Sequence, residues 1–258
     1  DHRDLHSFPT RRSSDLKGSY HLMYRRPMVM LLTHLVEKDP EYVNLALEHP
    51  ENYKILDNSL IELGGALSMD RLVAAAEKVK ADEIILPDVF KDGEATVRST
   101  KNSIQWLRDH NKLGIYKLMA VCHGTTPEAF KKCFDELSSL PEIDVIGIPK
   151  VMSSFNWVTN RNRASLFDIF KDGNAEIHFL GSWYQLGELL TMPKKVYSRV
   201  RSCDTCLFAL DVIQNIDFFT DRNGTIDLEK TYPELKEETY LTFMEAFEDA
   251  FMDALHTR

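Results

Sequence analysis

The sequence predicts an α/β fold, and within that class a single (β/α)8 barrel of the TIM type with an amphipathic helix at its C-terminal end. Short apolar runs recur about 25 to 35 residues apart along most of the chain, and amphipathic helical stretches separate them. This alternation is typical of a parallel sheet. No run is followed by a G-x-G-x-x-G or G-x-x-x-x-G-K-[ST] loop, so an open nucleotide-binding sheet lacks its usual signature.

Seven apolar runs are expected to form strands, and an eighth is weakly indicated. The seven runs span residues 28–34, 53–59, 82–88, 117–124, 145–150, 176–182 and 196–205, and the eighth spans 224–230. Helical stretches include residues 68–81, 126–140 and 183–192. Ser68 and Thr126 are typical N-cap residues, and Pro127 stands at a favoured first helical position. The amphipathic segment 237–256 is expected to close the bottom of the barrel or to mediate dimerisation.

The length of the chain fits one domain. A barrel of this type needs roughly 200 to 250 residues, and the chain has 258. Residues 1–16 carry charges without apolar periodicity and look like a translated sequencing adapter, so we expect them to be an artefactual tail. Residues 17–258 are expected to form the barrel domain.

Charge and cysteine content exclude some classes of protein. The net charge of −9 argues against a protein that coats nucleic acid nonspecifically, although a local basic patch is compatible with it. No apolar run reaches the roughly 18 residues of a membrane span. Four cysteines are too few for a disulfide scaffold, and no secretory signal is visible, so we expect a cytoplasmic protein.

Polar residues gather where the predicted strands end. The residues at these ends are Asp57, Asn58, Asp88, His123, Gly124, Gly147, Lys150 and Asp204. In a parallel barrel such positions converge on the C-terminal mouth, where active sites are built. A carboxylate cluster there can bind a metal, act as acid and base, or carry out double displacement at a sugar carbon. No metal-ligand motif accompanies the carboxylates, so we expect neither a metal nor a cofactor.

The stretch from Cys203 to Cys206 offers thiols at C-x-x-C spacing around Asp204. A zinc site needs four ligands, and no second C-x-x-C exists, because Cys122 and Cys133 are far away in the sequence. A redox pair normally follows a first strand and opens a helix. We therefore expect the aspartate to carry the chemistry. His178 lies mid-strand, where a histidine more often supports the core than binds a ligand.

Six ordered motifs resemble the tRNA-guanine transglycosylase family over about four-fifths of the chain. They are "LDNSLIELG" (56–64), "ADEIILPDVF" (81–90), "MAVCHGTTPEAF" (119–130), "IDVIGIPK" (143–150), "IHFLG" (177–181) and "RSCDT" (201–205). The resemblance implies an enzyme that exchanges guanine in a polynucleotide for a 7-deazaguanine and leaves the strand intact. The zinc subdomain of tRNA-acting members has no counterpart here, so DNA is favoured over tRNA, as in phage-encoded relatives.

The resemblance also implies roles for individual residues. Asp57 would be the general acid and base, and Asp204 the nucleophile that attacks C1′ of the sugar. The implied substrate-binding residues are Asp88, His123, Gly124, Gly147, Asn58 and Glu62. The chain departs from the family at three of these motif positions: His123 and Glu62 replace glutamines, and Ser59 replaces a glycine. Recognition of the base is therefore expected to differ.

Basic residues are available to hold the polynucleotide backbone around an extruded nucleotide. They are Lys150, Arg161, Arg163, Lys194, Lys195, Arg199 and Arg201. The expected partners are DNA or tRNA and a 7-deazaguanine, with a second copy of the chain possible and no membrane.

Two other functions remain open from the sequence. One is a small-molecule barrel hydrolase or lyase that uses the same carboxylates and needs no basic rim. The other is a barrel that binds nucleic acid or a 7-deazaguanine without turnover, which the replacement of a family glutamine by His123 keeps open.

Overall fold

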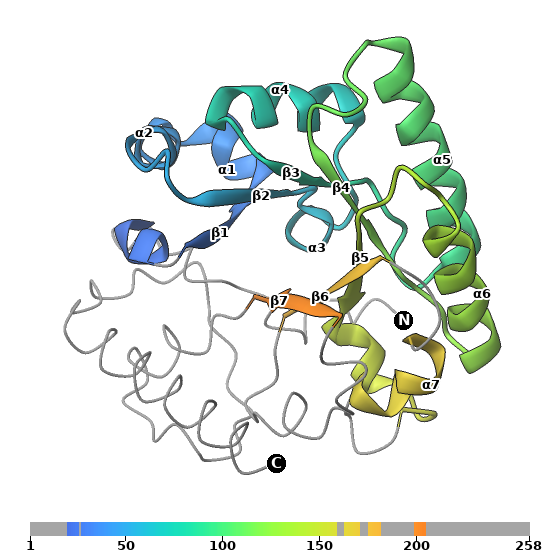
Figure 1. Ribbon diagram of the computed structural model, residues 1–258. Helices are drawn as coiled ribbons and strands as arrows, with labels where there is room; N and C mark the ends of the chain where they lie inside the picture. Colours follow the sequence, from blue (N-terminus) through green and yellow to red (C-terminus); the bar gives the residue numbers. More distant parts are fainter. Residues whose placement is uncertain (1–19, 26, 159–162, 171–174, 182–198, 205–258) are drawn as a thin grey trace, which may run out of the picture.

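A computed structural model describes residues 20–25, 27–158, 163–170, 175–181 and 199–204 (Figure 1). The strands are β1 (Met28–Leu32), β2 (Tyr53–Asp57), β3 (Glu83–Ile85), β4 (Lys117–Val121), β5 (Val145–Pro149), β6 (Glu176–Leu180) and β7 (Val200–Cys203). The α-helices are α1 (Thr33–Lys38), α2 (Pro40–Glu48), α3 (Leu60–Leu63), α4 (Met69–Val79), α5 (Gly93–Asp109), α6 (Pro127–Ser138) and α7 (Phe167–Phe170). Short 3-10 helices are η2 (Tyr20–Arg25), η3 (Lys150–Ser154) and η5 (Arg163–Leu166).

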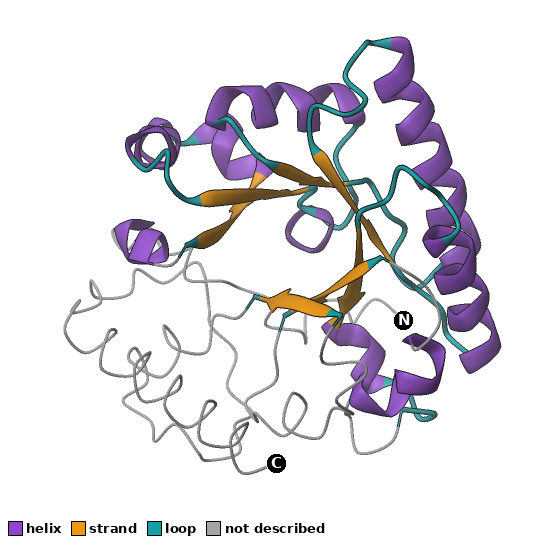
Figure 2. Ribbon diagram, viewed as in Figure 1, coloured by secondary structure: helices purple, strands orange, loops and turns teal. Residues whose placement is uncertain are grey.

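The seven strands form one parallel sheet in which each strand pairs with the next in sequence, from β1 to β7. The sheet is curled, and α1, α2, α4, α5 and α6 lie along its convex side (Figure 2). The predicted α/β class and all seven predicted strands are confirmed. The predicted segments 1–16, 183–192, 224–230 and 237–256 lie outside the described residues. No helix in the described ranges is long and apolar enough to cross a membrane.

Alternating side chains give the curled sheet two different faces, because successive residues of a strand point to opposite sides. On the convex face, residues such as Leu31, Leu56 and Ile146 join the helices in the main core. On the concave face, a separate apolar cluster consists of Met30, Ile55, Ile85, Met119, Val121 and Val145. Both faces are therefore buried, as is usual for a parallel sheet covered by helices.

The two predicted helix caps have different outcomes. The Thr126 hydroxyl accepts a hydrogen bond from Ala129 N at 3.2 Å, with Pro127 in the first turn, as predicted for α6. Ser68 occupies the N-cap position of α4 with extended backbone angles, but its side chain accepts no backbone hydrogen bond there. Its position was predicted correctly and its capping bond was not.

An ion pair joins strands β3 and β7 across the concave side. Arg201 Nη1 lies 2.6 Å from Glu83 Oε2, and Arg201 Nη2 donates to Glu83 Oε1 at 3.1 Å. Glu83 is fully buried, and the hydroxyl of Tyr53 also donates to it at 2.8 Å. Burial lowers the pKa of Arg201, but the hydrogen bonds and the charge of Glu83 outweigh this effect and raise it. Two strands that are not neighbours thus face each other across the interior.

We expect Glu83→Leu to lower the free energy of unfolding by about 3 kcal/mol, because it leaves the mostly buried Arg201 charge without its main partner. The double variant Glu83→Leu/Arg201→Leu should recover most of this loss, since neither charge then remains. Urea denaturation of both variants measures the difference. If Glu83→Leu alone is as stable as the wild type, the ion pair does not stabilise the curled sheet.

Candidate active site

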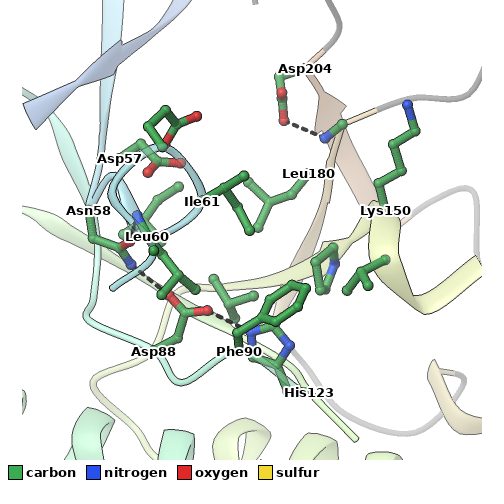
Figure 3. A pocket seen from close by; sticks show the side chains of 17 residues that line it. Asp57, Asn58, Leu60, Ile61, Asp88, Phe90, His123, Lys150, Leu180 and Asp204 are labelled. Atoms are coloured by element: carbon green, nitrogen blue, oxygen red, sulfur yellow. Dashed lines mark hydrogen bonds and ion pairs between the residues drawn. The ribbon is translucent and has the colours of Figure 1, made fainter. Parts of the chain in front are cut away.

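One pocket lies at the carboxyl ends of the strands, over the concave side of the sheet (Figure 3). Its lining surrounds about 930 Å³ of space, and this volume includes open solvent. The predicted site residues that line it are Asp57, Asn58, Glu62, Asp88, His123, Lys150 and Asp204. The structure therefore brings residues from five strand ends, spread over 148 positions of sequence, into a common cavity.

Asp57 is held by the turn that follows β2. Its Oδ1 accepts a hydrogen bond from Ser59 N at 2.6 Å, while Asn58 Oδ1 accepts one from Leu60 N at 2.9 Å. These side-chain bonds are typical of aspartate and asparagine in turns. Ser59 has a left-handed backbone with φ of 59°, and its hydroxyl contacts His34 Nδ1 at 2.9 Å. Ser59 stands where the family that the motifs resemble has a glycine, and it has a side-chain partner at a backbone conformation that normally favours glycine.

Asp88 forms the centre of a buried polar network. Asn58 Nδ2 donates to Asp88 Oδ1 at 2.7 Å and to Leu86 O at 2.9 Å. On the other oxygen, Asp88 Oδ2 lies 2.6 Å from His123 Nε2. His123 is 1% exposed, and its Nδ1 has no hydrogen-bond partner among the described residues. A buried polar atom of this kind suggests an acceptor or donor for a ligand.

Asp204 follows β7 and faces the same pocket. Its Oδ1 accepts a hydrogen bond from Gly181 N at 2.9 Å and lies 3.1 Å from His178 Nε2. Gly181 has φ of +67°, and a Cβ there would lie 3.2 Å from Lys150 Cβ. Two features favour glycine at position 181: its positive φ, and the close approach of the aliphatic part of the Lys150 side chain.

The walls between these polar groups are apolar. They are formed by Leu60, Ile61, Ile85, Phe90, Val121, Pro149, Val151 and Leu180. Ile61 belongs to α3, which carries it over the pocket (Figure 3). Apolar walls with a few polar groups suit a heteroaromatic ring whose edge forms hydrogen bonds. Sequence reasoning missed these residues, although the apolar "LIEL" (60–63) shortly after Asp57 was a signal for Leu60 and Ile61.

The two predicted glycines are not in this pocket. A Cβ on Gly124 would lie 2.3 Å from Phe130 N, so this glycine lets the loop pack against the start of α6. A Cβ on Gly147 would lie 2.9 Å from the end of the Leu180 side chain, and its carbonyl accepts a hydrogen bond from Cys122 N. Close packing accounts for glycine at both positions, and their predicted role in binding stays a prediction.

Three of the predicted phosphate-binding arginines hold the fold instead. Arg163 is fully buried and donates to Ile148 O at 2.7 Å, to Leu180 O at 3.0 Å and to Gly181 O at 2.6 Å. Arg199 donates to Ala175 O, and Arg201 pairs with Glu83, both at the end of the strands opposite the pocket. The prediction is corrected for these three, because their guanidinium groups already have protein partners.

The other predicted basic residues remain candidates for contacts with the polynucleotide backbone. Lys150 lines the pocket and is 5% exposed. Arg161, Lys194 and Lys195 lie outside the described residues.

Within the described part of the chain, no three His, Cys, Asp or Glu side chains are grouped so that they could hold a metal ion. None of the three cysteines in the described part of the chain lines the pocket. Burial raises the pKa of the Cys122 thiol, whereas a hydrogen bond from Cys122 lowers that of the buried Cys133. Cys203 packs against the main core on the convex face of the sheet. Cys206 is outside the described residues. The arrangement can perform acid, base and nucleophilic chemistry through its carboxylates.

We expect Arg163→Met to lower the free energy of unfolding by about 3 kcal/mol, because three carbonyl groups, one in a fully buried hydrogen bond and two in partly buried ones, lose a charged donor. Arg98→Met removes an exposed arginine of α5 by the same substitution and should change stability by less than about 0.5 kcal/mol. Chemical denaturation of both variants tests the structural role. Equal stability of the two would return Arg163 to the group of candidate ligand contacts.

Comparison of the chain with protein-family models and with curated proteins gave no match. The resemblance of the six motifs therefore depends on their residues and on where the structure places them. Each of the six motifs carries a residue that lines the pocket at a strand end, namely Asp57, Asp88, His123, Lys150, Leu180 and Asp204.

Proposed function

We propose that this protein is a pentosyltransferase that exchanges guanine for a 7-deazaguanine base in a polynucleotide. The observation that supports this function best is that Asp57 and Asp204 line one pocket together with the buried Asp88–His123 pair. The proposal includes closure of the curled sheet into a (β/α)8 barrel by an eighth strand at residues 224–230.

The proposed reaction has two displacements at C1′ of the sugar. In the first, a carboxylate oxygen of Asp204 bonds to C1′ while the bond from C1′ to the guanine ring nitrogen breaks. The electron pair goes to that nitrogen, which takes a proton from Asp57. In the second, the incoming base gives its ring N–H proton to Asp57 and bonds to C1′, and the electron pair of the Asp204–C1′ bond returns to the carboxylate. Two inversions retain the configuration at C1′ and leave the phosphodiester chain intact.

Asp88 and His123 are proposed to read the edge of the base. Asp88 accepts hydrogen bonds on both oxygens, and His123 Nδ1 has none from the described residues. A purine between the apolar walls would place its polar edge against this pair. An imidazole offers one ring nitrogen where a glutamine offers an amide, so the choice of base is expected to differ from that of glutamine-containing relatives.

DNA is the favoured polynucleotide, because residues 1–258 contain no cluster of cysteines and histidine like that of the zinc subdomain in tRNA-acting members. Lys150 at the pocket and Arg161, Lys194 and Lys195 remain the proposed phosphate contacts. The enzyme would have to extrude the target nucleotide to reach C1′ and the base together.

The structural role of Arg163, Arg199 and Arg201 favours a second candidate. Because these three arginines bind protein groups, the proposed phosphate contacts lose three cations. The alternative function is therefore a small-molecule hydrolase or lyase that uses the same carboxylates and needs no contacts to phosphates. Such an enzyme would act on free nucleosides and not on the polynucleotide.

Exchange of radiolabelled guanine into duplex DNA, single-stranded DNA and tRNA tests the function directly. We expect Asp204→Asn to abolish exchange by several orders of magnitude and to keep the wild-type melting temperature, because an amide is nearly isosteric but a poor nucleophile. Exchange near the wild-type rate in this variant would contradict the nucleophile assignment. No exchange by the wild type on any of the three substrates, with turnover of free nucleosides, would favour the alternative.

Substitutions of Asp57 and Asp88 should impair different steps, the first the exchange reaction and the second the binding of the base. Asp57→Asn should still bind 7-deazaguanine but stall exchange, because it cannot transfer a proton. Asp88→Ala should weaken binding of the free base by about tenfold or more, since each unpaired buried donor costs roughly 1–3 kcal/mol. Calorimetric titration with 7-deazaguanine and exchange rates, measured on both variants, separate the two roles. The reverse pattern would mean that the two carboxylates are assigned the wrong way round.

A further inference from the structure

His178 connects strands β6 and β7 below Asp204. Its side chain is 1% exposed, on the concave face of the sheet. Nδ1 lies 2.7 Å from Ser202 Oγ, and Nε2 lies 3.1 Å from Asp204 Oδ1. His178 does not line the pocket, so it acts through Asp204 and not on a ligand directly.

A β-bulge in β7 creates this contact. The register runs from Ile177 opposite Val200 to His178 opposite Ser202, so β7 has one residue more than β6 at this point. Val200 and Cys203 both pack against the main core on the convex face, and Arg201 and Ser202 lie between them in the sequence. Without the extra residue, the alternation of β7 would turn Ser202 and Asp204 away from His178. Bulges often re-aim side chains next to active sites in this way.

The hydrogen bonds fix which ring nitrogen of His178 carries the proton. An ionised carboxylate only accepts hydrogen bonds, so the contact of Asp204 Oδ1 with His178 Nε2 requires the proton on Nε2. The Ser202 hydroxyl, which accepts from Arg201 Nε at 3.2 Å, then donates to Nδ1. A neutral imidazole whose Nδ1 accepts must carry its proton on Nε2. This N–H then donates to the carboxylate of Asp204. The chain of donors runs from the buried Arg201 to the carboxylate at the pocket.

We infer that His178 is a positioning residue for Asp204. This inference rests on the proposed function, in which Asp204 is the nucleophile. With Gly181 N, His178 places two donors on Oδ1, and these restrict rotation of the carboxylate. The plane of the carboxylate is then set before the sugar arrives, which matters because misplacement by about 1 Å costs about 100-fold in rate. The same two donors stabilise the carboxylate charge that returns in the second displacement.

Two amide substitutions separate positioning from packing. In His178→Gln the side-chain amide reaches about as far as Nε2 of the imidazole and can donate to Asp204. In His178→Asn the amide reaches only as far as Nδ1, so it can contact Ser202 but not Asp204. We expect His178→Gln to keep exchange within about tenfold of the wild type, and His178→Asn to lower kcat about 100-fold with KM unchanged. Melting temperatures check that both variants fold.

Equal losses of kcat in the two folded variants, or a change confined to KM, would overturn the inference. A second measurement needs no activity. In protein labelled with nitrogen-15 at histidine, NMR should show His178 protonated on Nε2 and unprotonated on Nδ1, with the signals assigned by their loss in His178→Gln. Protonation on Nδ1 alone would also overturn it. Should the wild type fail to exchange guanine on any substrate, the proposed function fails, and the NMR result still decides whether Nε2–H faces Asp204.

Discussion

The ion pair between Glu83 and Arg201 is the contact on which the arrangement of the site depends. It joins residues 118 positions apart on strands β3 and β7, which are not neighbours in the sheet, across the concave side. A flat sheet would keep these side chains well apart, because neighbouring strands lie about 4.8 Å from each other. Their contact therefore requires the sheet to curl, and the curl brings the carboxyl ends of the strands from β2 to β7 around one pocket.

The β-bulge in β7 couples the stability of the curl to the chemistry of the site. The additional residue lets Arg201 turn inward to Glu83 and also places Ser202 and Asp204 on the face of His178. One local irregularity thus supplies both the ion pair near the start of the strands and the support for the carboxylate at their end. A regular strand would achieve only one of these, because its side chains alternate strictly.

The three carboxylates of the pocket differ in what they contact, and the differences correspond to the proposed roles. Asp57 is held by a turn amide, Asp88 is bound on both oxygens by Asn58 and His123, and Asp204 is held on one oxygen by Gly181 and His178. Each oxygen of Asp88 can accept a second hydrogen bond, so this carboxylate, whose orientation the protein donors fix, is suited to binding the edge of a ligand. Different surroundings for neighbouring carboxylates are the usual way in which one site separates its acid, base and nucleophile.

The sequence by itself determined the α/β class, the seven strands and the aspartates at their ends, because hydrophobic periodicity is local and parallel strand ends converge on one edge. Only the tertiary structure decided which cations are structural. Arg163 and Arg201 resemble surface residues in the sequence, since their partners are distant carbonyl groups and Glu83. It also decided the part played by His178, which depends on a register shift between two strands. The register of the strands and the curvature of the sheet determine which side chains from distant segments meet. Neither can be predicted from the local pattern of residues.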